Sequence, residues 1–340
     1  MPEDLNWKYE FYNIIKNGEL DKAEDLIVEK MGLDIDDEDI ENFLKAIKFW
    51  KNRREFFTFS ENSGEVLLGE WNNFLTFCLN NRIENKKLLN SFKAFVYSKA
   101  IDFLIDSYKV SPIKEKEKLY MLGCALYELG FIDKAIETFE FLFSLTNEKD
   151  YKIYIWLANL YYEIGENELS MMMYNDAFFY FSQLINAEDL KDVRIKKIIE
   201  NIKKDGFVKE EEILEWLPVY CYIYDILTVK RKLEYGDFVD LRERIKKYEK
   251  SLETDKKVFY VLIPRLINHY LWIVDYYLYQ ANSIEPVQSV LKRIGELFDM
   301  LDNKDVILKL KERTDFVVNK LCEKKLALKE GVSGGDNSSW

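Results

Sequence analysis

The chain contains one histidine, His269, so histidine-based acid–base chemistry would depend on this residue alone. It lies in an aromatic stretch together with Arg265, Asn268, Tyr270 and Asp275. His269 and Asp275 are about six residues apart, which puts them on different faces of a helix and argues against a direct pair. We interpret these side chains as a polar network inside a helical core, because buried polar groups need hydrogen-bond partners. The alternative is a pocket for a polar ligand or partner.

No other pattern of reactive residues indicates catalysis. The sequence lacks a glycine-rich phosphate loop, a GxSxG elbow and an HExxH motif. Its cysteines form no CxxC pair, so we expect buried thiols in a reducing compartment and no zinc site. They are Cys78, Cys124, Cys221 and Cys322. We predict that the protein is not an enzyme and has no catalytic residue, cofactor or metal.

The composition is typical of a soluble helical protein. Of the 340 residues 48% are hydrophobic and 32% charged, and only 5 are proline and 13 glycine, which favours long helices and an all-α fold. The net charge of −12 argues against a general nucleic-acid binder, because phosphate binding needs a cationic surface. The first residues show no cationic segment followed by an apolar run, so we expect no signal peptide and a cytoplasmic protein.

Two aromatic stretches, 213–229 and 259–279, are apolar enough to be tested as membrane spans. Each carries charged residues, among them Glu215 in the first and Arg265 in the second. A charge near the centre of a spanning helix costs roughly 2.5–3.5 kcal/mol. We therefore predict buried core helices and no stable membrane insertion.

Two charged stretches near the N-terminus invite functional interpretations. The acidic run 34–41 lacks the glycine and final glutamate of a calcium loop, so we expect it to stabilise a helix N-terminus. The helix expected over 40–56 is locally basic, which predicts a solvated face or, alternatively, a surface for an acidic partner. Its basic residues are Lys45, Lys48, Lys51, Arg53 and Arg54.

The most regular part of the chain is 116–181, where two segments of similar pattern follow each other at a spacing of about 35 residues. Each predicts a helix, a turn carrying a glycine, and a second helix. The corresponding pairs are Leu122/Leu157, Gly123/Ala158, Gly130/Gly165, Ala135/Ser170 and Phe139/Tyr174. The small residues predict close packing of the two helices within each hairpin. Residues 7–30 follow the same design around Asn17-Gly18.

These residues resemble the tetratricopeptide repeat, which has a period of 34 residues and the pattern W-x₂-L-G-x₂-Y…A-x₃-F…P. The first copy matches at Leu122, Gly123, Gly130, Ala135 and Phe139, with Leu119 at the tryptophan position and Leu126 at the tyrosine position. The second copy matches at Tyr154, Leu157, Ala158, Tyr161, Gly165, Ser170, Tyr174 and Ala177. The segment from Trp7 matches in part, and the C-terminal half departs from the pattern.

The resemblance implies a helical-hairpin solenoid with a concave surface lined by the first helix of each repeat. A groove of aromatic and polar residues suits a peptide or an amphipathic helix. The residues that share this face, and which we predict to bind the partner, are Tyr120, Tyr127, Glu128, Lys152, Ile155, Asn159, Tyr162 and Glu163. Asn159 would suit capture of a C-terminal carboxylate, but Tyr120 and Glu128 depart from that pattern.

We therefore predict a tetratricopeptide-like array over 1–183, a divergent helical domain over 184–328 and a disordered tail over 329–340. The function we expect is a scaffold or adaptor that binds a protein or peptide. One alternative is a structural subunit of a larger assembly, such as motility or envelope machinery, which docks through aromatic C-terminal helices. Another is a regulator that senses a peptide or small ligand. A homo-oligomer is a further option.

Overall fold

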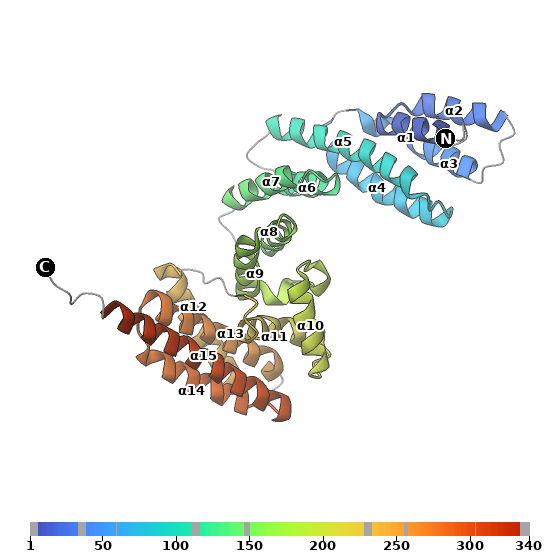
Figure 1. Cartoon of the computed structure of the whole chain (residues 1–340). Coiled ribbons are helices and arrows are strands. Elements are labelled where there is room, and N and C mark those ends of the chain that lie inside the picture. Colours follow the sequence, from blue (N-terminus) through green and yellow to red (C-terminus); the bar gives the residue numbers. More distant parts are fainter. Residues whose placement is uncertain are drawn as a thin grey trace. The chain divides into compact units, whose positions relative to one another are not determined.

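A computed structural model of the chain describes residues 6–32, 39–58, 60–110, 116–145, 150–227, 233–254, 258–302 and 304–333. Across these ranges the chain forms helices α1 to α15 with short helical turns, and no strand (Figure 1). The all-α prediction is confirmed for this part of the protein. Residues 34–38 of the acidic run and 334–340 of the predicted tail lie outside it.

The chain divides into two compact units, Met1–Glu148 and Lys149–Trp340. The helices of unit 1 are α1 Asn6–Lys16, α2 Leu20–Gly32, α3 Asp39–Lys51, α4 Ser63–Asn80, α5 Lys86–Val110, α6 Lys116–Glu128 and α7 Ile132–Leu145. Those of unit 2 are α8 Tyr151–Glu163, α9 Asn167–Phe181, α10 Val193–Lys204, α11 Glu210–Ile223, α12 Tyr235–Thr254, α13 Phe259–Asp275, α14 Glu285–Asp299 and α15 Lys304–Ser333. Shorter helical turns are η2 Arg54–Phe57, η3 Ser182–Leu184, η4 Ala187–Asp189 and η6 Tyr276–Gln280. The predicted boundary at residue 183 falls inside unit 2.

The predicted helix–glycine–helix segments are observed as the pairs α1–α2, α6–α7 and α8–α9. Gly130 and Gly165 have positive φ angles of 81° and 83°, which a residue with a Cβ adopts only with strain. The amide of Phe131 donates to the carbonyl of Leu126 at 2.9 Å, and that of Glu166 to Tyr161 at 2.8 Å. These are the 6→1 bonds of Schellman caps, so both glycines end their first helices as predicted.

Small residues bring the two helices of each hairpin together. A Cβ added to Gly123 of α6 would lie 2.7 Å from the ring of Phe139 on α7, so any larger residue there would force this ring to shift. In the second hairpin the hydroxyl of Ser170 donates to the carbonyl of Ala158 at 2.8 Å. The close approach predicted from these positions is confirmed.

Unit 1 is built around an aromatic core to which α1, α3, α4 and α5 contribute. Phe11 and Phe43 stack with their ring centroids 4.9 Å apart, and Trp50 is fully buried. The basic side chains near the end of α3 bind acidic groups of the same unit. Lys51 pairs with Asp21 at 2.7 Å and also with Glu24, Arg54 pairs with Asp21, and Arg53 pairs with Glu70 at 2.7 Å. These contacts connect α2, the end of α3 with the turn after it, and α4. Lys45 also pairs with Glu41 at 3.8 Å, so four of the five basic residues are engaged within the protein.

Unit 2 has one core that α8 and α9 share with the helices that follow them. In this core Tyr154 and Tyr174 belong to the same cluster as Trp216 and Phe298, whose rings stack with centroids 6.1 Å apart. Helix α13 packs against α11, α12 and α14, and α14 packs against α15 (Figure 1). The stretches 213–229 and 259–279 thus supply the core helices α11 and α13. No helix in the described ranges combines the length and apolar character needed to cross a bilayer.

Candidate functional site

The predicted binding residues fall in both units, three on α6 in unit 1 and five on α8 in unit 2. On α6, the half-buried Tyr120 packs edge-on against Phe139, with ring centroids 5.7 Å apart. Tyr127 is half-buried, and the exposed Glu128 forms an ion pair with Lys93 of α5. These side chains therefore contribute to packing and ion pairing within unit 1.

On α8, Asn159 is only 5% exposed and its amide is occupied by the chain itself. Its Nδ2 donates to the main-chain carbonyl of Asp189 at 2.8 Å, and its Oδ1 accepts from the main-chain amide of Lys191 at 3.0 Å. The hydroxyl of Tyr174 also donates to Oδ1. Asn159 therefore binds the backbone at the end of η4 and just after it, and its side-chain amide is not available to an external carboxylate in this structure.

The same segment covers the neighbouring positions of α8. Lys191 pairs with Glu163 at 3.8 Å, and the guanidinium of Arg194 lies 6.0 Å from the ring centroid of Tyr162. Leu190, in an extended conformation, is fully buried.

The other two predicted residues of α8 differ from each other. Ile155 is buried in the core of unit 2, and Lys152 is exposed. The face expected to receive a partner on α8 is thus occupied by the connection between α9 and α10. Of the predicted residues on α8, Lys152 and Glu163 are the ones whose exposure suits contact with a partner.

The polar residues of α13 do not form the single network expected from sequence, because the side chains of Arg265, Tyr270 and Asp275 bind Glu215, Glu249 and Tyr222 respectively. The first of these contacts is a buried charged pair. Arg265 and Glu215 of α11 are 8% and 2% exposed, and Nε of Arg265 donates to Oε2 of Glu215 at 3.1 Å. Its Nη2 donates to Oε1 of Glu215, which also accepts from the hydroxyl of Ser182 at 3.1 Å. With the amide of Gln183 oriented so that its oxygen faces the guanidinium, that oxygen accepts from Nη1 and Nη2 at 2.6 and 2.7 Å.

His269 is fixed in its neutral form next to this pair. Burial lowers the pKa of His269 to about 3, and the positive charges of Arg244 and Arg265 act in the same direction. Nδ1 donates to the carbonyl of Arg265 at 2.8 Å, and the ring stacks on Phe179. Nε2 is buried and has no hydrogen-bond partner among the described residues. Asp275 instead accepts from the hydroxyl of Tyr222 at 3.0 Å, so His269 and Asp275 form no catalytic pair.

A cleft of about 880 Å³ lies beside the Glu215–Arg265 pair. Side chains from η3 and the loop after it, from the start of α11 and from α13 line it. Its lining residues are Ser182, Gln183, Ile185, Asn186, Lys209, Glu210, Glu211, Leu214, Glu215, Val261 and Arg265. The volume is in the range of about 300–1,000 Å³ that is usual for ligand sites.

The exposed charges of this cleft are unequal. Glu210 and Glu211 are exposed and make no hydrogen bond or ion pair with any described residue. Lys209 lies over the ring of Tyr260, with Nζ 4.5 Å from the ring centroid. The lining therefore has two unpaired carboxylates and one ammonium group, since the charges of Glu215 and Arg265 neutralise each other.

Sequence reasoning did not find this cleft. The sequence indicates Glu215 only as a charge inside an apolar stretch and Arg265 as part of a polar group on its own helix, because nothing in a single sequence links two positions 50 residues apart. The three successive acids at the start of α11, Glu210 to Glu212, were a detectable signal, but acids in a first turn also stabilise the helix dipole.

No protein-family model matches the chain, and a search of curated proteins finds no relative.

Proposed function

We propose that this protein is a non-catalytic helical scaffold that binds a segment of another protein, and that the segment binds in the cleft between α11 and α13. The tetratricopeptide-like array is part of this proposal. Its support is the pair of glycine-capped hairpins α6–α7 and α8–α9 at the predicted spacing. We place the partner site in the cleft and not on α8, because residues 189–191 of the chain itself bind to α8.

The observation that carries the proposal is the combination of a cleft of about 880 Å³ with polar side chains fixed at its base. Arg265 is held by Glu215 and Gln183, so the base of the cleft is ordered before any partner arrives. Preorganised sites bind more tightly because less side-chain freedom is lost on association. Val261, which is half-buried in the lining of the cleft, adds apolar surface that a partner side chain can cover.

The structural-subunit alternative has less support. It requires aromatic residues of the C-terminal helices at the surface, and Trp216 and Tyr220 are 1% and 0% exposed. Tyr235, Tyr260 and Tyr279 are exposed, but they lie on separate elements. We therefore favour the scaffold.

A peptide-display selection on the intact chain tests the proposed function. A library of random 12-residue peptides is selected, and the enriched peptides are measured on the wild type and on Val261→Trp, which fills the cleft. Val239→Trp on α12 is the matched control, because Val239 is exposed and is not part of the cleft lining. We expect binding to be lost in Val261→Trp and kept in Val239→Trp. Equal binding to both variants, or no enriched peptide, would overturn the proposal.

A further inference from the structure

From the charge and lining of the α11–α13 cleft we infer the chemistry of its ligand: a peptide segment in which lysine or arginine residues alternate with apolar ones. This inference rests on the proposed function. The first step is the charge. Glu210 and Glu211 are unpaired within the described chain, and Lys209 is the one cationic group of the lining besides the neutralised Arg265. A cationic side chain entering the cleft therefore finds carboxylates with no competing partner.

The second step excludes an anionic ligand. A buried arginine in a cleft is the group that usually recognises a carboxylate or phosphate. Here both the Nε and the Nη2 of Arg265 donate to Glu215, and Nη1 and Nη2 donate to Gln183. All three guanidinium nitrogens of Arg265 therefore already donate hydrogen bonds to groups of the protein. An anion would also approach Glu210 and Glu211, in a chain whose net charge is −12.

The third step is the apolar wall. Ile185, Leu214 and Val261 line the cleft, and since Ile185 and Leu214 are 4% and 5% exposed, the half-buried Val261 offers most of their hydrocarbon surface next to the carboxylates. A free polyamine matches the carboxylates but not this wall. A peptide with a leucine-like residue beside each basic residue matches both, because removal of its apolar side chain from water favours binding. The ligand class is therefore a basic and apolar segment.

The test uses fluorescein-labelled nonapeptides and the full-length protein. The probe is three repeats of glycine-arginine-leucine, compared with versions that have glutamate for arginine or serine for leucine. We expect the arginine–leucine peptide to bind, and both altered peptides to bind at least roughly fivefold more weakly. Binding should weaken as salt rises from low to high concentration, because exposed charge pairs are screened.

Two variants with equal charge change separate the cleft from the general charge of the protein. Glu210→Gln/Glu211→Gln should weaken the arginine–leucine peptide by roughly three- to tenfold, since two exposed ion pairs are lost. Glu166→Gln/Glu168→Gln, in which two exposed acids at the start of α9 are changed, should stay within about twofold of wild type. Thermal unfolding of each variant checks that the fold is retained.

The outcomes distinguish this inference from the proposed function. If display-selected peptides bind in the cleft but carry no basic residues, or if they bind there while the arginine–leucine probe does not, the ligand class is wrong and the scaffold function stands. Displacement of the probe by spermidine at equal concentration would also overturn the inferred ligand class, because the apolar residues of the cleft would then contribute nothing to binding. If neither the selected peptides nor the probe bind, the proposed function itself fails.

Discussion

Glu215 and Arg265, 50 residues apart in the chain, form a buried ion pair that joins α11 to α13. The pair is completed by Ser182 and Gln183, which follow α9, so three segments of unit 2 meet at one charge cluster. Removal of one partner leaves the other charge buried without compensation. Replacement of both by apolar residues of similar size removes the desolvation cost together with the attraction.

This arrangement predicts a difference between single and double substitutions. Glu215→Leu should lower the free energy of unfolding by about 3–5 kcal/mol, because it leaves the charge of the buried Arg265 guanidinium uncompensated. Glu215→Leu/Arg265→Met should be close to wild type or more stable. Urea denaturation followed by circular dichroism measures both. Lys246→Met, which breaks the exposed pair with Glu243, should change little. A double variant that is less stable than Glu215→Leu would contradict the prediction.

The hydrogen bonds of the Asn159 side chain to the backbone at Asp189 and Lys191 should contribute to the stability of the protein. Asn159→Ala leaves the carbonyl of Asp189 without its donor and the hydroxyl of Tyr174 without its acceptor, whereas the amide of Lys191 still donates to that hydroxyl at 3.3 Å. The expected loss is about 2–4 kcal/mol, since each buried polar group left unsatisfied costs about 1–3 kcal/mol. Thermal or urea unfolding measures it.

Lys152→Ala, at an exposed position of the same helix, is the control and should change stability by less than about 0.5 kcal/mol. If Asn159→Ala instead leaves stability unchanged and abolishes binding of a selected peptide, the partner binds α8 after all. The two variants thus test the position of the binding site independently of the cleft.

The helices and their turns were predictable from sequence because their signals are local. Gly130 and Gly165 marked the ends of helices that need a positive φ, and Gly123 marked the close contact with Phe139 only 16 positions later. The spacing of about 35 residues between the two hairpins could be read from the same residues. These features depend on periodicity and on residue size within one hairpin.

The exposure of the α8 face around Asn159 was less predictable, because it depends on a segment without hydrophobic periodicity. Asn159 was assigned to an open groove from its spacing on α8, but residues 186–192 are largely irregular and extended, and no pattern indicates where they pack. Their contacts with α8 involve main-chain groups, which every residue has. A single sequence therefore gives the position of Asn159 on its helix without the identity of what covers it.

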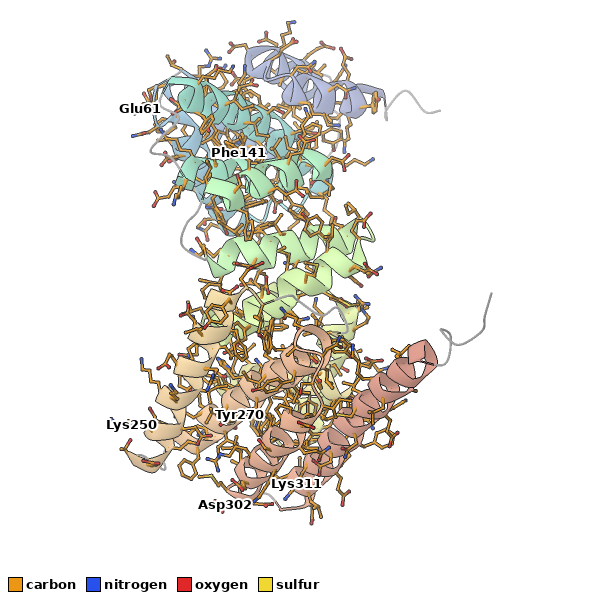
Figure 2. The ribbon with its side chains drawn as sticks, turned by 90° about the vertical axis from the view of Figure 1, so that its left-hand side faces the viewer. Glu61, Phe141, Lys250, Tyr270, Asp302 and Lys311 are labelled. Carbon is orange, nitrogen blue, oxygen red and sulfur yellow. The ribbon has the colours of Figure 1, made fainter. Side chains whose placement is uncertain are left out.

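The carboxylate of Glu249 on α12 predicts a specific dependence of stability on pH. Tyr270 of α13, labelled among the C-terminal helices in Figure 2, donates to Oε1 at 2.8 Å, and Nε of Arg293 of α14 donates to it at 2.9 Å. Burial alone would raise the pKa of Glu249, but the hydrogen bonds from Arg293 and Tyr270 outweigh it and lower the pKa below 4.5.

A lowered pKa means that ionised Glu249 stabilises the folded state above pH 4.5, and that this contribution is lost as the pH falls through the folded-state pKa. Glu249→Gln should therefore reduce stability at pH 7 by about 1–3 kcal/mol, as expected for hydrogen bonds to a charged group. The difference from wild type should shrink at acid pH. Urea unfolding at several pH values measures it, with the exposed Glu253→Gln as baseline. A difference that stays constant across the acid range would contradict the prediction.

We expect the four cysteine thiols to react slowly with thiol reagents in the folded protein. Burial raises the pKa of both Cys78 and Cys124 to about 12, from an ordinary value of 9.0, and it also raises the pKa of Cys221 and Cys322. Only the thiolate reacts, and a pKa near 12 lowers its fraction at pH 8 by about a thousandfold.

An aromatic disulfide reagent should therefore label the native protein slowly at pH 8, and all four thiols rapidly in urea. Cys124 is half-buried whereas the other three are buried, so it should react first, and its rate should rise with pH towards 10. Cys124→Ser should remove that first phase and leave the slower ones. Rapid labelling of Cys221 in the folded state would show that α11 opens far more often than its fully buried position in unit 2 implies.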